Sequence, residues 1–287
     1  MEGTKRPPSP VEDVDVVVVS TRCGGECPGR QRRASPDLGA DPRATFALTC
    51  LGAQGGAPDP MSKCGVVTPH GVCDDSRLCA ELSGHRDGIA FFEVYGGDPP
   101  SRVLHQTDHF AVLIDLAPLV VGHLLIVPKE HRLSFGQVPL HQWEELLGLR
   151  GQVVDQIRHR YGEVMILEHG SSSDLTFSAC VSHAHWHVLP LLIDLLPTLE
   201  ADGLSGSAVD SIHDLRAYGR ADLPYILYDK LEAGTWLFDG GISKRHQYLR
   251  AVVAEQVGIP DPEWDWSLFQ NRDAFRSTYR DLEAAWD

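Results

Sequence analysis

The pattern of apolar and polar positions changes character about sixty residues into the chain. Residues 1–60 are broken by Pro- and Gly-rich segments and contain one short apolar run, Val16–Val19. Such a segment buries too little apolar surface to offset the entropy lost on ordering. We therefore expect residues 1–60 to be a disordered tail, or an upstream start misassigned in the gene, and the folded sequence to follow from Met61.

Short apolar runs between residues 89 and 192 predict strands that follow one another along the chain. The predicted strands are Arg102–Gln106, Phe110–Ile114, Gly122–Pro128, Glu163–Leu167 and His183–Leu192, and Ile89–Tyr95 fits a strand or a short helix. Apolar side chains recur at three-and-four spacing over Pro139–Arg160, which predicts one long helix. Strands in runs around a single helix predict an α+β fold on an antiparallel five-stranded sheet, as a domain over 61–192 with its core at 76–192.

Residues 193–287 form a second block, predicted to be a mixed α/β C-terminal extension. Its predicted elements are helices at Ser211–Tyr218, Gln247–Val257 and Asp273–Trp286 and a hairpin of Tyr225–Tyr228 with Thr235–Phe238. Gly258 and Pro260 end the middle helix, because neither residue favours its continuation.

Composition narrows the classes of partner. Lys and Arg number 25 against 40 Asp and Glu, a net charge of −15, which argues against a protein that coats nucleic acid. No apolar run reaches the roughly twenty residues that span a bilayer, and the Met1 end lacks a secretory leader pattern. The sequence predicts a cytoplasmic protein without membrane or nucleic-acid partners. Six of the seven cysteines precede residue 80, and we interpret them as free thiols in a poorly ordered lead segment.

The sequence His183-Ala184-His185-Trp186-His187 carries the candidate chemistry. Alternate side chains of a strand share a face, so the three imidazoles are expected to project together. Three interpretations compete: a solvent-facing strand, a zinc site, and a nucleophilic imidazole that attacks phosphorus while its neighbours orient it and handle protons.

The run HAHWHVLP resembles the signature of the histidine-triad (HIT) family, His-φ-His-φ-His-φ-φ, in which φ is apolar. Upstream, LIDLAPLVVGHLLIVPKEH at residues 113–131 is similar to the strand–turn–strand of that family, with its Asp, its proline-containing turn, Gly-His and Pro-Lys-x-His. The resemblance covers about residues 76–192. Such relatives occur in bacteria, and the chain's Arg/Ala/Asp/Gly-rich composition fits a bacterial source.

The resemblance implies nucleotidyl transfer or hydrolysis at an α-phosphate. His185 matches the histidine that forms a covalent nucleoside-monophosphate intermediate, His187 matches the one that contacts phosphate oxygens or the leaving group, and His183 is expected to brace the site. Asp115 matches the acid that holds the ribose hydroxyls. Cys180 stands where relatives place a hydroxyl donor that assists the leaving group.

A zinc site in many relatives joins Cys-x2-Cys to two histidines. Here Ser76 occupies the first cysteine position, while Cys79, His131 and His183 match the other three ligands, so the fourth is missing unless Cys73 reaches in. We therefore predict no cofactor and no metal ligand in the catalytic site, and leave a structural zinc ion open.

The extension is expected to cover or narrow the site. KRHQYLR resembles the Gln-x-x-Arg helix that follows the triad domain in some larger bacterial relatives, which makes Gln247 and Arg250 candidate nucleotide-binding residues. Arg250 is interpreted either as a phosphate or carboxylate clamp or as an exposed helix residue. Trp264 and Trp266 are interpreted as packing anchors rather than as a base-stacking platform.

The resulting hypothesis is a nucleotide hydrolase acting on a dinucleoside polyphosphate, a phosphoramidate or an acyl-nucleotide. Ala184 and Trp186 between the histidines favour it over the alternative, a nucleotidyltransferase acting on a sugar phosphate. A non-enzymatic nucleotide-binding module and a zinc enzyme stay open as different classes. Homodimerisation is expected from the resemblance.

Overall fold

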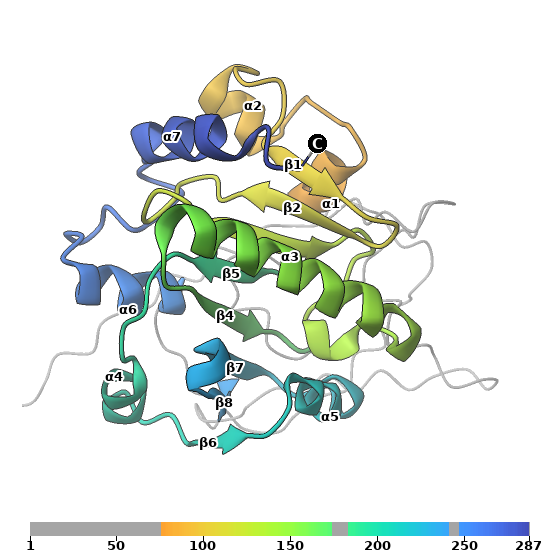
Figure 1. Ribbon diagram of the computed structural model, residues 1–287, viewed down its shortest axis with the longest axis vertical. Helices are drawn as coiled ribbons and strands as arrows, with labels where there is room; N and C mark the ends of the chain where they lie inside the picture. The colour runs from red at the N-terminus through yellow and green to blue at the C-terminus, as the bar shows by residue number, and fades with distance from the viewer. Residues whose placement is uncertain (1–75, 174–182, 241–246, 287) are drawn as a thin grey trace, which may run out of the picture. The chain divides into compact units, whose positions relative to one another are not determined.

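The computed structural model describes residues 76–173, 183–240 and 247–286 (Figure 1). All described residues belong to one compact unit. The expectations for residues 1–60 therefore lie outside the described residues. In the described part of the chain, no helix is long and apolar enough to cross a membrane.

One antiparallel sheet runs through the described residues, with strand order β1-β2-β3-β5-β4-β7-β8-β6. Its strands are β1 Val103–Gln106, β2 Phe110–Ile114, β3 Leu124–Pro128, β4 Met165–Gly170, β5 Trp186–Leu189, β6 Gly206–Val209, β7 Tyr225–Asp229 and β8 Thr235–Asp239. The predicted α+β class with antiparallel pairing is confirmed. The predicted hairpin forms between β7 and β8, and the sheet continues beyond the five predicted strands because β7 also pairs with β4.

The helices are α1 Arg77–Leu82, α2 Ala90–Tyr95, α3 Trp143–Tyr161, α4 Leu196–Ala201, α5 Leu215–Ala221, α6 Tyr248–Val257 and α7 Arg272–Leu282. The ambiguous segment at residues 89–95 is the helix α2, which ends where Gly96 adopts the left-handed conformation. Tyr95 of α2 stacks on Phe275 of α7, and the two helices lie together near the β1 edge (Figure 1).

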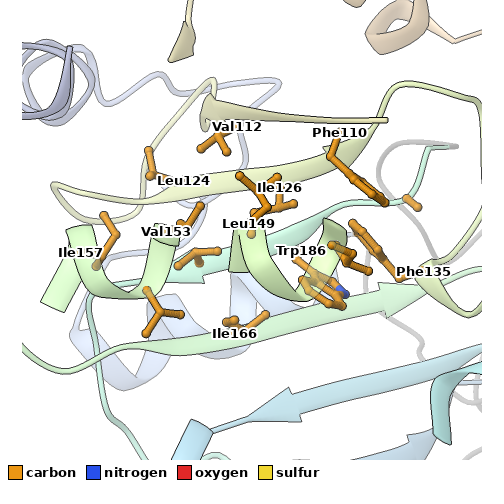
Figure 2. Close-up of a cluster of buried hydrophobic side chains, with 14 of the residues drawn as sticks. Phe110, Val112, Leu124, Ile126, Phe135, Leu149, Val153, Ile157, Ile166 and Trp186 are labelled. Atoms are coloured by element: carbon orange, nitrogen blue, oxygen red, sulfur yellow. The ribbon is translucent and has the colours of Figure 1, made fainter. Parts of the chain in front are cut away.

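The long helix α3 covers one face of the sheet. Its side chains Leu149, Val153 and Ile157 are fully or nearly fully buried and belong to one cluster with side chains from four strands (Figure 2). Those strand residues are Val112, Ile126, Ile166 and Trp186. Because side chains alternate along a strand, the neighbours of these residues face the other side of the sheet. There His187 lies between Leu125 and Leu167 in register.

The helix α6 covers part of this second face. Leu249, Val252 and Val253 of α6 share a buried cluster with Met165 and Leu167 of β4. The C-terminal extension therefore packs on the same face as His187, next to the strand that carries it.

A buried carboxyl group joins three elements under β5. Glu168 is fully buried and accepts hydrogen bonds from the Phe135 N–H at 2.8 Å, the Trp186 indole N–H at 2.9 Å and the Tyr225 hydroxyl at 2.7 Å. Burial raises the pKa of Glu168 to about 7, against the opposing effect of these donors. Glu168 thereby links the segment after β3, β5 and β7 of the extension.

We expect Glu168 to make the stability of the protein depend on pH. Its folded-state pKa is above the unfolded value of 4.5, so the unfolded state ionises first and the free energy of unfolding falls as pH rises from about 4.5 to about 7. The expected loss is about 3 kcal/mol at most. Chemical denaturation across this range should show a shallower pH dependence in Glu168→Gln, which is neutral at every pH; equal slopes in the two proteins would contradict the assignment.

Candidate functional site

A pocket opens beside the sheet face that lies opposite α3. It encloses about 650 Å³ of space, part of it open to solvent, and is lined by polar residues of the sheet region together with Arg250 and Trp266 of the extension. The polar sheet-region residues that concern the chemistry are Asp115, His185 and His187.

A backbone hydrogen bond fixes the tautomer of His185. Its Nδ1 lies 2.7 Å from the carbonyl oxygen of His183, and a carbonyl only accepts, so Nδ1 carries the proton. The lone pair of the neutral ring is therefore on Nε2. Burial lowers the pKa of His185, which favours the neutral ring. The arrangement leaves an imidazole nitrogen with a free lone pair on a pocket-lining residue.

A second chain of hydrogen bonds fixes His187 in the opposite tautomer. The Leu119 N–H donates to Nδ1 of His123 at 3.2 Å, so the neutral His123 ring carries its proton on Nε2. That Nε2 lies 3.0 Å from Nδ1 of His187 and donates to it. Burial, with the neighbouring His185 and His123, lowers the pKa of His187 well below its usual range. His187 is then neutral with its proton on Nε2, which suits a hydrogen-bond donor to a ligand in the pocket.

The carboxylate of Asp115 is held by residues from both blocks of the chain. Its Oδ1 accepts from the Ala117 N–H at 2.9 Å and from an Arg250 N–H at 3.0 Å. Its Oδ2 lies 3.8 Å from His123 Nε2 and 3.9 Å from His187 Nδ1. Burial opposes ionisation, but the positive charge of Arg250 and the two histidines outweigh it and hold the pKa of Asp115 well below its usual range.

Arg250 links α6 to the turn between β2 and β3 through hydrogen bonds. Its guanidinium donates to Asp115, to the Ala117 carbonyl at 2.6 Å and to the Trp264 carbonyl at 3.0 Å, and its side chain is 3% exposed. The expectation of an exposed helix residue is wrong, because these three acceptors bury it. The guanidinium contacts the carboxylate of the pocket and so joins the extension to the triad domain.

Two groups of described residues bring metal-ligating atoms within 4.8 Å of one another: Cys79 with His131 and His183, and Asp115 with His123 and His187. In the first group, the Cys79 Sγ lies 3.3 Å from His131 Nδ1 and 3.2 Å from His183 Nδ1. His183 donates from Nε2 to the Pro128 carbonyl at 2.7 Å, so its Nδ1 lone pair faces the sulfur. One thiol and two imidazole nitrogens with a second-shell carbonyl suit zinc.

The second group does not suit a metal ion. His123 accepts a backbone N–H at Nδ1, so its Nε2 carries the proton and has no lone pair for a ligand bond. The hydrogen-bond pattern makes Asp115, His123 and His187 a proton-ordered cluster instead.

The structure separates the predicted site residues. His185, His187, Asp115 and Arg250 line one pocket. His183 does not project with the other two imidazoles as expected: β5 begins only at Trp186, and the ring of His183 turns to Cys79 and His131. Cys180 lies outside the described residues.

Gln247 is buried and acts on the pocket indirectly. Its side-chain amide donates to the Asp265 carboxylate at 2.6 Å and its side-chain oxygen accepts from the Trp266 N–H at 3.3 Å. It therefore holds the segment that carries Trp266, and it is not among the pocket-lining residues.

Sequence reasoning missed two residues of the site. His123 was part of the Gly-His motif but was given no role, and only its distance to His187 reveals one. Trp266 was interpreted as a packing anchor; it is half-buried and also lines the pocket. The sequence carried no signal for that position, because it depends on how α6 and the segment after it pack.

Part of the chain is similar to known proteins. Residues 97–192 match the family model described as the HIT domain. An adenosine 5'-monophosphoramidase of Schizosaccharomyces pombe is 27% identical over 100 residues, which is 35% of this chain and 71% of the relative. An uncharacterised HIT-like protein of Methanocaldococcus jannaschii is 24% identical over 102 residues, 35% of this chain and 76% of the relative.

Among solved structures, a Zn-bound histidine triad family protein of Mycobacterium smegmatis is similar with a TM-score of 0.32. It has 20% sequence identity, and the match covers 52% of this chain and 92% of that one. The sequence motifs, the family-model match and the relatives agree that residues 97–192 form a HIT domain.

Proposed function

We propose that the protein is a nucleotide hydrolase that acts at an α-phosphate through a covalent nucleotidyl intermediate on His185. The observation that carries this proposal is the 2.7 Å hydrogen bond from His185 Nδ1 to the His183 carbonyl, which leaves the Nε2 lone pair as the nucleophile. The similarity to a monophosphoramidase supports the class of reaction.

The proposed reaction has two displacement steps. In the first, the Nε2 lone pair of His185 forms a bond to phosphorus while the bond from phosphorus to the leaving group breaks, and the leaving group departs with the bonding pair. The Nε2–H of His187 donates a hydrogen bond to the departing atom, which takes its proton from bulk water. In the second, a water oxygen attacks phosphorus, the P–N bond breaks and its electron pair returns to His185 Nε2. The proton of the attacking water passes to bulk water, and nucleoside monophosphate is released.

Asp115 is proposed to accept the two ribose hydroxyls. A carboxylate held by Ala117 and Arg250 through Oδ1 keeps Oδ2 for further acceptance, and its low pKa keeps it ionised. A nucleotidyltransferase with a sugar-phosphate acceptor would use the same first step and stays the alternative. The homodimer, the cytoplasmic location and the absence of nucleic-acid partners stay predictions from the sequence.

Replacement of the nucleophile is the direct test. His185→Ala should lower release of nucleoside monophosphate by about 10³-fold or more, because the covalent route is lost. The full-length chain is incubated with adenosine and guanosine phosphoramidates, dinucleoside polyphosphates, acyl-nucleotides and nucleotide sugars, and products are separated by chromatography. His159→Ala, an exposed residue of α3, is the matched control. Equal release by His185→Ala and the wild type would contradict the mechanism.

His123 is predicted to be a positioning residue for His187. His123→Phe removes the donor to His187 Nδ1 and should lower kcat by about 10- to 100-fold with little change in KM. His123→Gln keeps an N–H donor on a side chain of similar reach and should recover most of that loss. If the two variants lose activity equally while both stay folded, the hydrogen bond to His187 does not matter for the reaction.

A zinc ion is proposed to bind at Cys79, His131 and His183 rather than in the catalytic pocket. A bound ion there would fix the segment before β5 and so the carbonyl that orients His185. We expect metal analysis of the full chain to find zinc near one per chain, and Cys79→Ser to lose it with a lower Tm, while His187→Ala retains it. Zinc lost on His187→Ala but kept in Cys79→Ser would reverse the assignment.

A further inference from the structure

A buried ion pair lines the same pocket as His185 and His187. Arg102, which precedes β1, donates from Nε and Nη2 to the two oxygens of Glu81 on α1, both at 2.7 Å. The side chains are 7% and 8% exposed, and both residues line the pocket. The wall around the pair includes the apolar residues Leu78 and Ile89 and the charged Arg77.

Stability alone does not explain a charged pair at this position. The desolvation of two charges cancels much of their attraction, and apolar residues of similar volume stabilise such sites equally well. One further hydrogen bond, from Arg102 Nη1 to the Ile114 carbonyl at 3.0 Å, anchors the guanidinium beside the strand end that leads to Asp115. The pair is thus fixed next to the proposed ribose site.

The fixed pair has further hydrogen-bond donors and acceptors for a ligand in the pocket. Each Glu81 oxygen uses one lone pair on Arg102 and has another, and three of the five N–H groups of Arg102 have the partners described above. Because the remaining lone pairs of the two oxygens point apart, the wall presents one Glu81 acceptor next to an Arg102 donor. Guanine carries the complementary edge, with the N1–H and the 2-amino group as donors beside the O6 acceptor, whereas adenine carries one amino group between two acceptors.

We infer that Glu81 and Arg102 read the hydrogen-bonding edge of the nucleobase and select a guanine nucleotide. The inference rests on the proposed function: a nucleotide with its phosphate at His185 and its ribose at Asp115 has its base in the same pocket as the pair. One Glu81 oxygen accepts from the N1–H and the 2-amino group of the base, and Arg102 donates to O6 while holding the carboxylate in place. Both are specificity-determining residues that the HIT motifs do not include.

Binding of product nucleotides to the full chain tests the inference. We expect GMP to bind about 10- to 100-fold more tightly than purine riboside 5'-monophosphate. The latter lacks O6, the N1–H and the 2-amino group and therefore cannot form the charge-assisted hydrogen bonds with Glu81 and Arg102. IMP, which lacks only the 2-amino group, should fall between them. In Glu81→Gln the GMP preference should shrink to about threefold or less, because a neutral amide replaces one acceptor by a donor. Affinities are measured by titration calorimetry.

Two further variants separate specificity from folding. Arg150→Gln breaks another largely buried ion pair, with Asp229 at 2.5 Å, whose members do not line the pocket, and should leave the GMP preference unchanged. The double variant Glu81→Gln with Arg102→Gln replaces the ion pair by two neutral amides, so that no unpaired buried charge destabilises the protein. It should bind GMP and purine riboside 5'-monophosphate with equal affinity. Thermal melts establish that each variant is folded.

The outcomes distinguish this inference from the proposed function. Equal binding of GMP and purine riboside 5'-monophosphate by the wild type, or an undiminished preference in folded Glu81→Gln, would overturn base reading even where phosphoramidates are hydrolysed. A GMP preference lost in Glu81→Gln, with no turnover of any guanosine substrate, would support base reading and count against the hydrolase.

Discussion

The site depends on the pleat of one strand. In β5, Trp186 enters the core under α3 and donates to Glu168, while His187 projects to the pocket on the opposite face. Because alternate side chains of a strand point to opposite sides, packing of the indole determines where the imidazole lies. A slip of the β3–β5–β4 register by one residue would exchange these two side chains. The register of β5 therefore fixes both the packing of Trp186 in the core and the position of His187 at the pocket.

Burial gives the histidines their chemical identity. In water an imidazole exchanges between tautomers and titrates near neutral pH, but here backbone groups assign each proton: the His183 carbonyl to His185, and the Leu119 N–H, through His123, to His187. One pocket histidine is left with a lone pair on Nε2 and the other with a proton. His185 and His187 are thus held in opposite tautomers by their hydrogen-bond partners.

The C-terminal extension completes the fold and the pocket of the triad domain. It continues the sheet through β4 and β7, and Arg250 places a cation on the carboxylate of Asp115. Gln247 holds the segment that brings Trp266 to the pocket wall. A boundary at residue 192 stays a useful division of the sequence, although hydrogen bonds and packing cross it.

Local patterns in the sequence determined the α+β class, the antiparallel strands and the long helix, because periodicity and short-range spacing encode them. The candidate roles of His185, His187 and Asp115 came from the resemblance of their motifs to the HIT family. The tertiary structure decided the rest. It joined the extension to the sheet, turned His183 toward Cys79, buried Arg250 and placed Glu81 beside Arg102. These are contacts between residues far apart in the chain, and their geometry follows from packing and desolvation, which the order of residues along the sequence does not display.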